Sequence, residues 1–373
     1  MYKTIQAMDE RAAEQRLRDP VDPRDPEDSG EGKSAVEELI RKAYERLKEG
    51  EAASAQGLLK EALAADFEHP EVLYALKCLN WWLEKIKRLD SFSEPYERGE
   101  YLLSQWKSYY GFLDRIGDAG LPKELTDSCQ YALKRFVYLE ALKYFLDLLK
   151  DGANQQDPVL LLQIGRCCKG AGNWEDALKY LEQAGSFKRE DSGILSELAD
   201  VNALLGETRA AKVLFREAFF LDPQGIDLPG LESEMIAGLR ERVRGLGYSG
   251  PELAEWIPVW GCIWGIFSVK RELKPVELGR LKQSILSLEN EFRSKSGGQK
   301  SDAGQKSGPN PLVKPRLLNR YFWLIDHCEH SRDTSGYKPV GYKPGGFQPG
   351  GLMDETLLKI KFIDPGVYEQ YRT

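Results

Sequence analysis

The sequence predicts an all-α fold made of consecutive helix hairpins, and three observations lead to that prediction. Between Ser34 and about Gly245, apolar residues recur at helical spacing in one segment after another. Short breaks rich in Gly, Pro and Asp separate these segments, and no convincing pair of alternating strands is present. A set of small and apolar residues also recurs after 34 residues. We therefore predict an α-solenoid of antiparallel hairpins with C-terminal capping helices and an extended tail.

The composition is that of a globular chain with an uneven charge. The 373 residues carry a net charge of −7, and 42% are hydrophobic, which argues against wholesale disorder, a collagen-like chain or a disulfide scaffold. Residues 270–373 hold 18 basic and 12 acidic side chains, whereas residues 1–269 hold 34 and 47. An acidic body with a mildly basic tail argues against nucleic acid as the main partner, and we expect none.

The chain divides into seven segments in order. Residues 19–33 contain three Asp-Pro steps and little to bury, and the first expected helix begins at Ser34, where Ser34 and Glu37 form a capping box. The middle part predicts helices near 71–88, 95–116 and 123–150. The segments are a disordered acidic N-terminal segment (1–33), the helical solenoid (34–245), capping helices (246–295), a flexible linker (296–311), a helix (312–331), a Gly/Pro/aromatic strip (332–351) and a C-terminal segment (352–373).

The repeat is carried by small residues and glycines at fixed spacing. Ile164, Gly165, Gly172, Ala177, Leu181 and Ala184 recur as Leu198, Ala199, Gly206, Ala211, Phe215 and Ala218, and upstream as Ala43, Gly50, Ala55, Leu59 and Ala62. Small residues let two helices approach closely, and glycine allows the tight turn between them. In these residues the chain resembles the tetratricopeptide repeat family, whose period is about 34 residues. The resemblance is clear over 158–223, good over 34–67 and only topological over 70–150.

The resemblance implies a right-handed superhelix whose concave groove binds a protein or peptide without catalysis. The groove residues it implies are Tyr44, Lys48, Leu162, Arg166, Lys169, Ser196 and Asp200, together with Ile40, Val159 and Ala203. Chaperone-binding members of the family have Lys and Asn where this chain has Leu162 and Arg166, so binding of an acidic chaperone tail is disfavoured. The alternative is that Arg166 and Lys169 form an ordinary solvated face.

Aromatic residues are concentrated in two segments, and in each they can form either part of the core or a binding surface. Fifteen of them lie between Tyr74 and Phe145, where they can fill the core, hold a small apolar ligand or bind a partner; Trp106, Tyr109 and Tyr110 are the expected exposed ones. Trp256, Trp260, Trp264 and Phe267 fall on one helical stripe. Few basic residues flank this stripe, so we expect it to cover the end of the solenoid and not to anchor a membrane.

The C-terminal part holds the remaining candidates. His327 and His330 could share a helix face, but zinc sites need three or four ligands, so we predict no metal and no cofactor. Three pentapeptides in 336–350 repeat an aromatic residue and a proline. Our hypothesis is that this strip, with Tyr337, Lys338, Tyr342, Lys343 and Phe347, docks on the acidic solenoid of its own chain; a solvated linker is the alternative.

These observations favour a non-catalytic scaffold or adaptor that binds a protein or peptide. The alternative is a metal-dependent or small-ligand-binding protein, with its site in the C-terminal part or among the aromatic middle hairpins. Six irregularly spaced cysteines, no signal peptide and no apolar run of about 18 residues lead us to expect a reduced, cytoplasmic protein without a transmembrane segment. Neither the partner nor the oligomeric state follows from the sequence.

Overall fold

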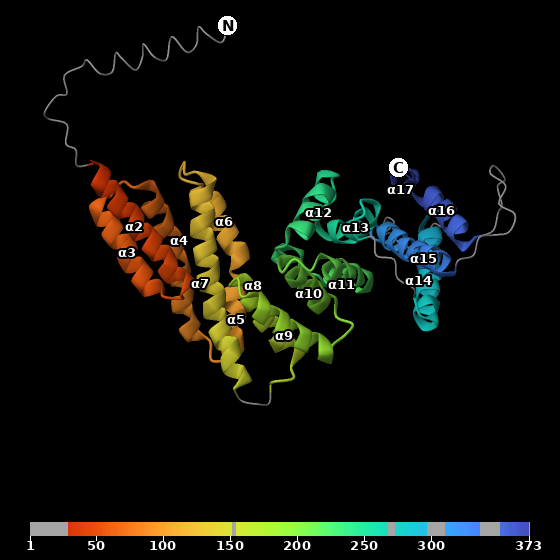
Figure 1. Ribbon diagram of the computed structural model, residues 1–373, viewed down its shortest axis with the longest axis horizontal. Helices are drawn as coiled ribbons and strands as arrows, with labels where there is room; N and C mark the ends of the chain where they lie inside the picture. Colours follow the sequence, from red (N-terminus) through yellow and green to blue (C-terminus); the bar gives the residue numbers. More distant parts are fainter. Residues whose placement is uncertain (1–28, 151–153, 268–272, 297–309, 336–350, 373) are drawn as a thin grey trace, which may run out of the picture. The chain divides into compact units, whose positions relative to one another are not determined.

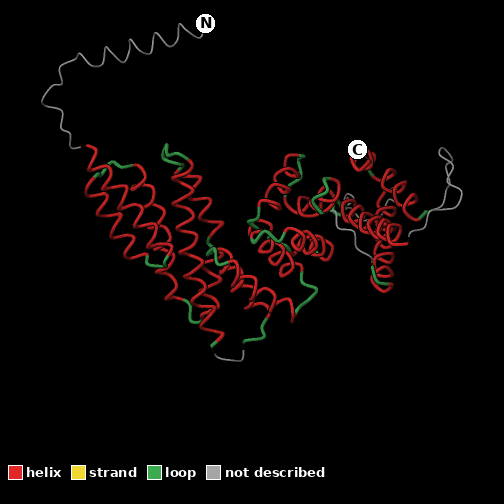
Figure 2. The backbone as a smooth tube through the Cα atoms, viewed as in Figure 1, coloured by secondary structure: helices red, strands yellow, loops and turns green. Residues whose placement is uncertain are grey.

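The computed structural model describes residues 29–150, 154–267, 273–296, 310–335 and 351–372. Within these ranges the chain is all-helical and contains no strand, which confirms the predicted all-α class (Figures 1 and 2). No helix in the described ranges is long and apolar enough to cross a membrane. The pentapeptide strip, with Tyr337, Lys338, Tyr342, Lys343 and Phe347, lies outside the described residues.

The helices follow one another along the chain with short connections. The first group is α2 (Ser29–Lys48), α3 (Ala52–Ala65), α4 (Pro70–Ile86), the 3₁₀ turn η1 (Lys87–Ser91), α5 (Pro95–Ser104), α6 (Trp106–Ile116) and α7 (Lys123–Leu149). The second is α8 (Pro158–Gly170), α9 (Trp174–Phe187), α10 (Ser192–Leu204), α11 (Thr208–Leu221), η2 (Pro223–Gly225), η3 (Leu228–Gly230) and α12 (Glu234–Gly245). The last is α13 (Gly250–Ile263), α14 (Pro275–Ser296), α15 (Val313–Ser335), α16 (Leu352–Ile363) and α17 (Pro365–Arg372).

The described helices belong to two compact units. Unit 1 comprises residues 1–91 and 104–137, and unit 2 comprises residues 92–103 and 138–373. The division therefore falls inside the span that the sequence assigns to a single solenoid.

The three repeat signatures each form a helix pair: α2 with α3, α8 with α9, and α10 with α11. Gly50, Gly172 and Gly206 end the first helix of each pair with φ between 79° and 86°, a conformation that favours glycine. The repeated alanines are completely buried: Ala43, Ala55, Ala62, Ala177, Ala184, Ala199, Ala211 and Ala218. A Cβ atom on Gly165 would lie 2.5 Å from Leu181 Cγ, so the close approach expected at this position is present.

Several boundaries differ from the prediction. The first helix begins at Ser29 and not at Ser34. The helix expected over 95–116 is broken at Gln105 into α5 and α6. The helix expected at 312–331 continues to Ser335, and the C-terminal segment, for which the sequence predicts no particular structure, forms α16 and α17 over residues 352–372.

The predicted aromatic stripe begins on α13 and continues beyond its end at Ile263, with Trp264 and Phe267 in the following turn, and it belongs to the core of unit 2. Trp256 is buried, and Phe267 packs on Phe215 and Phe219 of α11, with ring centroids 6.2 and 5.7 Å apart. Helix α13 also contacts α15, which packs on α14 and α16. The stripe therefore joins the last repeat pair to the C-terminal helices of this unit.

Candidate functional site

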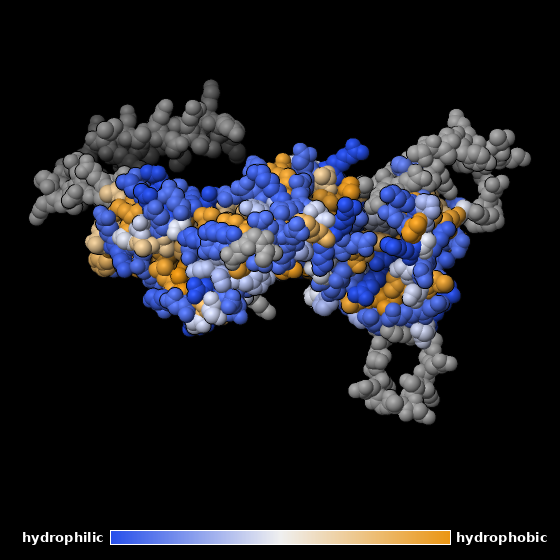
Figure 3. Space-filling model, turned by 90° about the horizontal axis from the view of Figure 1, so that it is seen from below, coloured by the Kyte–Doolittle hydropathy of each residue, from blue (hydrophilic) through white to orange (hydrophobic). Residues whose placement is uncertain are grey.

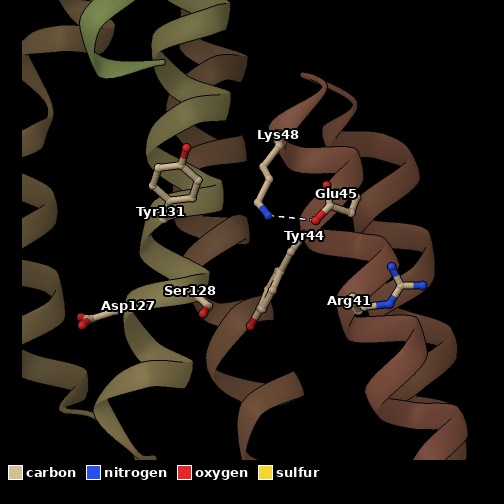
Figure 4. A pocket seen from close by; sticks show the side chains of 7 residues that line it. All are labelled: Arg41, Tyr44, Glu45, Lys48, Asp127, Ser128 and Tyr131. Atoms are coloured by element: carbon tan, nitrogen blue, oxygen red, sulfur yellow. Dashed lines mark hydrogen bonds and ion pairs between the residues drawn. The ribbon is translucent and has the colours of Figure 1, made fainter. Parts of the chain in front are cut away.

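An open groove in unit 1 contains two of the residues that the sequence analysis selected. Its volume is about 440 Å³. It is lined by Arg41, Tyr44, Glu45 and Lys48 of α2 and by Asp127, Ser128 and Tyr131 of α7 (Figure 4). On the face drawn in Figure 3, hydrophilic residues surround smaller apolar patches in both units, so apolar surface alone does not single out a site. The groove is defined by its shape and its side chains.

Helical spacing explains why these residues meet. On α2, Arg41, Glu45 and Lys48 follow one another at intervals of four and three residues and therefore share one face. The opposite face of α2 is apolar and buried, with Val36, Ile40, Ala43 and Leu47. On α7, Ser128 and Tyr131 face the groove, whereas their neighbours Cys129, Ala132 and Leu133 turn into the core and are completely buried. Both helices thus present a polar, aromatic strip over an apolar base.

Tyr44 forms the base of the groove and is fixed by a buried hydrogen bond. Its hydroxyl donates to Glu71 Oε1 of α4 at 3.0 Å. Burial raises the pKa of the Tyr44 hydroxyl far above its ordinary value, so the group remains a donor. Burial also raises the pKa of Glu71, although the hydrogen bond from Tyr44 opposes that shift. The ring of Tyr44 is therefore held in one orientation from behind.

Lys48 places a cation at the end of the groove. Its ammonium lies 2.9 Å from a carboxylate oxygen of Glu45 and 5.8 Å from the centroid of the Tyr131 ring. The hydrogen bond from Lys48 is the main reason why the pKa of Glu45 is lowered. Arg135 Nε donates to the backbone oxygen of Lys48 at 2.9 Å, which fastens α7 to the last turn of α2. The two walls of the groove are therefore bonded to each other.

The chemistry of this groove suits non-covalent binding. Tyr131 is 50% exposed and offers a large aromatic face, while Lys48, Glu45 and Asp127 provide charges of both signs. The Ser128 hydroxyl donates to the Glu124 carbonyl at 2.8 Å, so it is bonded along its own helix and not to a general base. A peptide with an apolar or aromatic side chain and neighbouring charges would meet complementary groups.

The residues expected to line a groove on the later repeats are only partly accessible. Leu162 is half-buried, and so is Arg166, whose Nε donates to Glu197 Oε1 at 2.8 Å. The prediction is wrong for Lys169, Ser196 and Asp200, which are all buried. The Ser196 hydroxyl donates to the Gly193 carbonyl at 2.9 Å within α10.

Lys169 and Asp200 form a buried ionic network instead of a groove surface. The Lys169 ammonium lies 2.5 Å from Glu197, 2.8 Å from Asp200 and 2.8 Å from the Gly230 carbonyl oxygen. Asp200 also accepts backbone N–H bonds from Glu232 and Ser233, each at 2.8 Å. The segment before α12 thus covers these side chains and uses their charges to bind itself to α8 and α10.

The three aromatic residues predicted to be exposed, Trp106, Tyr109 and Tyr110, differ in their exposure. Tyr110 is 60% exposed, as expected. Trp106 is half-buried against Trp82, with ring centroids 4.7 Å apart. The prediction is wrong for Tyr109, which is completely buried, because its ring packs between Trp81 and Trp82 at 5.0 Å from each. The aromatic residues of α4 and α6 therefore serve mainly as core of unit 1.

The histidines of α15 do not lie in a ligand cluster. No group of three or more His, Cys, Asp or Glu side chains in the described residues is arranged to hold a metal ion. His327 and His330 are both half-buried, and His327 Nδ1 accepts the backbone N–H of Leu273 at 3.1 Å. His327 thus holds the segment that precedes α14.

Sequence reasoning missed the α7 wall of the groove and Arg41. Tyr131 was one of fifteen aromatics between Tyr74 and Phe145, and its helix carries no repeat signature. Nothing in the local pattern pairs residues 127–131 with residues 41–48. No protein-family model matches this sequence, and no curated protein matches it.

Proposed function

We propose that this protein is a non-catalytic scaffold or adaptor that binds a peptide segment of a partner protein in the groove between α2 and α7. The observation that supports the proposal is an open groove of about 440 Å³ in which the exposed ring of Tyr131 lies beside Lys48, with the largely buried Tyr44 at the base. Aromatic and cationic side chains at the centre of a concave surface are typical of residues that dominate binding energy. The helix pairs α2–α3, α8–α9 and α10–α11 resemble tetratricopeptide repeats, and stacked repeats of this kind create concave surfaces that bind peptides.

The ligand expected from this lining is a short segment with an apolar or aromatic anchor and an acidic residue next to it. The anchor would pack on the rings of Tyr44 and Tyr131, and the acid would compete with Glu45 for the Lys48 ammonium. Glu45 and Asp127 would disfavour a strongly acidic peptide. The replacement of the expected Lys and Asn by Leu162 and Arg166 also disfavours a strongly acidic peptide such as a chaperone tail.

A random peptide library displayed on phage, selected on the immobilised full chain, tests the proposal directly. The affinity of the enriched peptides would be measured by fluorescence polarisation. We expect Tyr131→Ala and Lys48→Ala each to weaken binding at least tenfold, which corresponds to about 1.4 kcal/mol.

The matched controls are Tyr110→Ala and Lys60→Ala, which remove an exposed tyrosine and lysine of unit 1 outside the groove. These should leave the affinity unchanged. Failure to enrich any peptide, or equal losses in groove and control variants, would refute the proposal.

A further inference from the structure

A second cavity, in unit 2, has a different chemical character. It lies where the end of α11 meets α13, α14 and α15, and its volume is about 370 Å³. Its lining is Leu221, Asp222, Pro223, Glu255, Ser284, Ser287, Leu288, Arg316, Asn319 and Arg320. Cavities of this volume are common for small ligands. Two arginines and two serines on facing helices make it a candidate site for an oxyanion.

Arg320 is the central residue of this cavity. Its guanidinium carbon lies 4.0 Å from the centroid of the Phe220 ring, so the planar group is stacked on an aromatic face. Arg320 Nε donates to Ser284 Oγ at 3.3 Å. In the part of the chain that the structure describes, Arg320 forms no ion pair with any carboxylate. Burial lowers the pKa of Arg320 to about 10, which reflects a cation removed from water.

The acids that line the same cavity have other partners. Glu255 Oε1 accepts from Arg316 Nε at 2.8 Å, from Arg316 Nη2 at 2.6 Å and from Gln224 Nε2 at 2.9 Å. Asp222 Oδ1 accepts the backbone N–H of Gln224 at 3.1 Å at the start of η2. Glu255 therefore forms its ion pair with Arg316, and neither acid of the cavity forms an ion pair with Arg320.

A half-buried guanidinium without a counter-charge is unfavourable, and a bound anion would remove that cost. The guanidinium fork fits two oxygens of a phosphoryl group, and stacking on Phe220 already fixes its plane. The Ser284 hydroxyl oxygen accepts a hydrogen bond from Arg320 Nε, and its O–H can donate to a ligand oxygen. Ser287 lies about one turn further along α14 and lines the same cavity. Asn319 is not available in the same way, because its Nδ2 donates to the Phe219 carbonyl at 3.2 Å.

We propose that this cavity binds a phosphoryl group, held by the Arg320 guanidinium with the hydroxyls of Ser284 and Ser287. The phosphoryl group can belong to a small phosphate ester or to a phosphorylated serine side chain, and both present the same oxygens. The site uses none of the residues of the α2–α7 groove, so it stands or fails independently of the proposed function.

Isothermal titration calorimetry on the full chain tests the proposal with three probes: inorganic phosphate, O-phospho-L-serine and a short phosphoserine peptide. Sodium chloride would keep the ionic strength constant, because screening changes the affinity of any charged ligand. We expect saturable binding of at least one probe, and no heat from L-serine or the unphosphorylated peptide. The probe that binds most tightly identifies the source of the phosphoryl group.

Arg320→Gln should weaken the binding at least tenfold. The matched control is Arg280→Gln on α14, whose side chain is 74% exposed, and this variant should bind like the wild type. Arg320→Lys keeps the positive charge but lacks the planar guanidinium, so its affinity for the probe should lie between those of Arg320→Gln and the wild type. Circular dichroism confirms that each variant is folded.

Binding by Arg320→Gln equal to that of the wild type, or no binding of any probe to the folded wild-type chain, would overturn the assignment. Should Arg320→Gln fail to fold, Ser284→Ala supplies the same comparison, with a smaller expected loss of about three- to tenfold, about the worth of one hydrogen bond.

Discussion

Lys169 was predicted to line a binding groove, but in the structure it is buried and stabilises the interior of unit 2. The residue is 2% exposed, and its ammonium contacts Glu197, Asp200 and the Gly230 carbonyl. The two nearby carboxylates raise its pKa despite the opposing effect of burial, so the lysine remains charged. A buried charge of this kind contributes little as a pair but is costly to leave without its partner.

Lys169→Met tests this view. The variant leaves Glu197 and Asp200 buried without their cation, and we expect the free energy of unfolding to fall by about 3–5 kcal/mol. Lys179→Met is the matched control, because the Lys179 side chain is 73% exposed and pairs with Asp176 on the surface; it should cost at most about 1 kcal/mol. Guanidinium denaturation measures both. Similar losses in the two variants would contradict a structural role for the network.

Glu71 gives a pH dependence of stability. Burial raises its pKa in the folded chain, so the folded state holds a proton on Glu71 more firmly than the unfolded state does. The wild type should therefore lose stability relative to Glu71→Gln as pH rises above about 4.3, the ordinary pKa of glutamate, toward 7. Urea denaturation across this range measures the difference. Glu68→Gln, at an exposed acid, controls for the loss of one negative charge.

At the scale of elements, the repeat pairs were predictable and the other boundaries less so. Gly50, Gly172 and Gly206 marked three turns because glycine accepts the positive φ that each turn needs. The break at Gln105 has no Gly or Pro to reveal it. Helices α16 and α17 were not predicted because they are short and follow a Gly/Pro-rich strip, so the local pattern gives little helical signal.

A pair of glycine substitutions tests the close approach within a repeat pair. Gly165→Ala would place a Cβ 2.5 Å from Leu181 Cγ, and we expect a loss of about 1–3 kcal/mol. Gly57→Ala on α3 has nothing within 4 Å of the new Cβ and should gain about 0.5–1 kcal/mol, because alanine is the better helix former. Thermal unfolding compares them. A gain in both variants would show that α8 and α9 are not tightly apposed.

At the scale of the whole molecule, the helical class followed from periodicity but the division into two units did not. The unit boundaries follow residues 91, 103 and 137, and the last two lie at the end of α5 and inside α7, where the sequence has no linker composition. For the candidate groove, Tyr44 and Lys48 were found through the repeat signature, whereas Tyr131 and Asp127 required the fold. Pairing between distant helices depends on packing that no local pattern encodes.

Two compact units should respond separately to a core substitution. We expect hydrogen exchange in Lys169→Met to rise in α8, α10 and α12 while α2 and α3 keep their protection. Leu59→Ala, at a completely buried position of α3, should do the reverse. Mass spectrometry of peptic fragments resolves these regions. A uniform rise over both units would indicate one cooperative body.

The glycine turns also bear on the order in which the chain assembles. Each turn joins helices that are neighbours in sequence, so its contacts close a short loop at a small entropic cost. The Glu255–Arg316 pair joins residues 61 positions apart, and the bond from Lys169 to Gly230 spans the same separation. Because local contacts form faster than distant ones, we expect each repeat pair to form soon after its second helix is synthesised, and the buried ion pairs to close last.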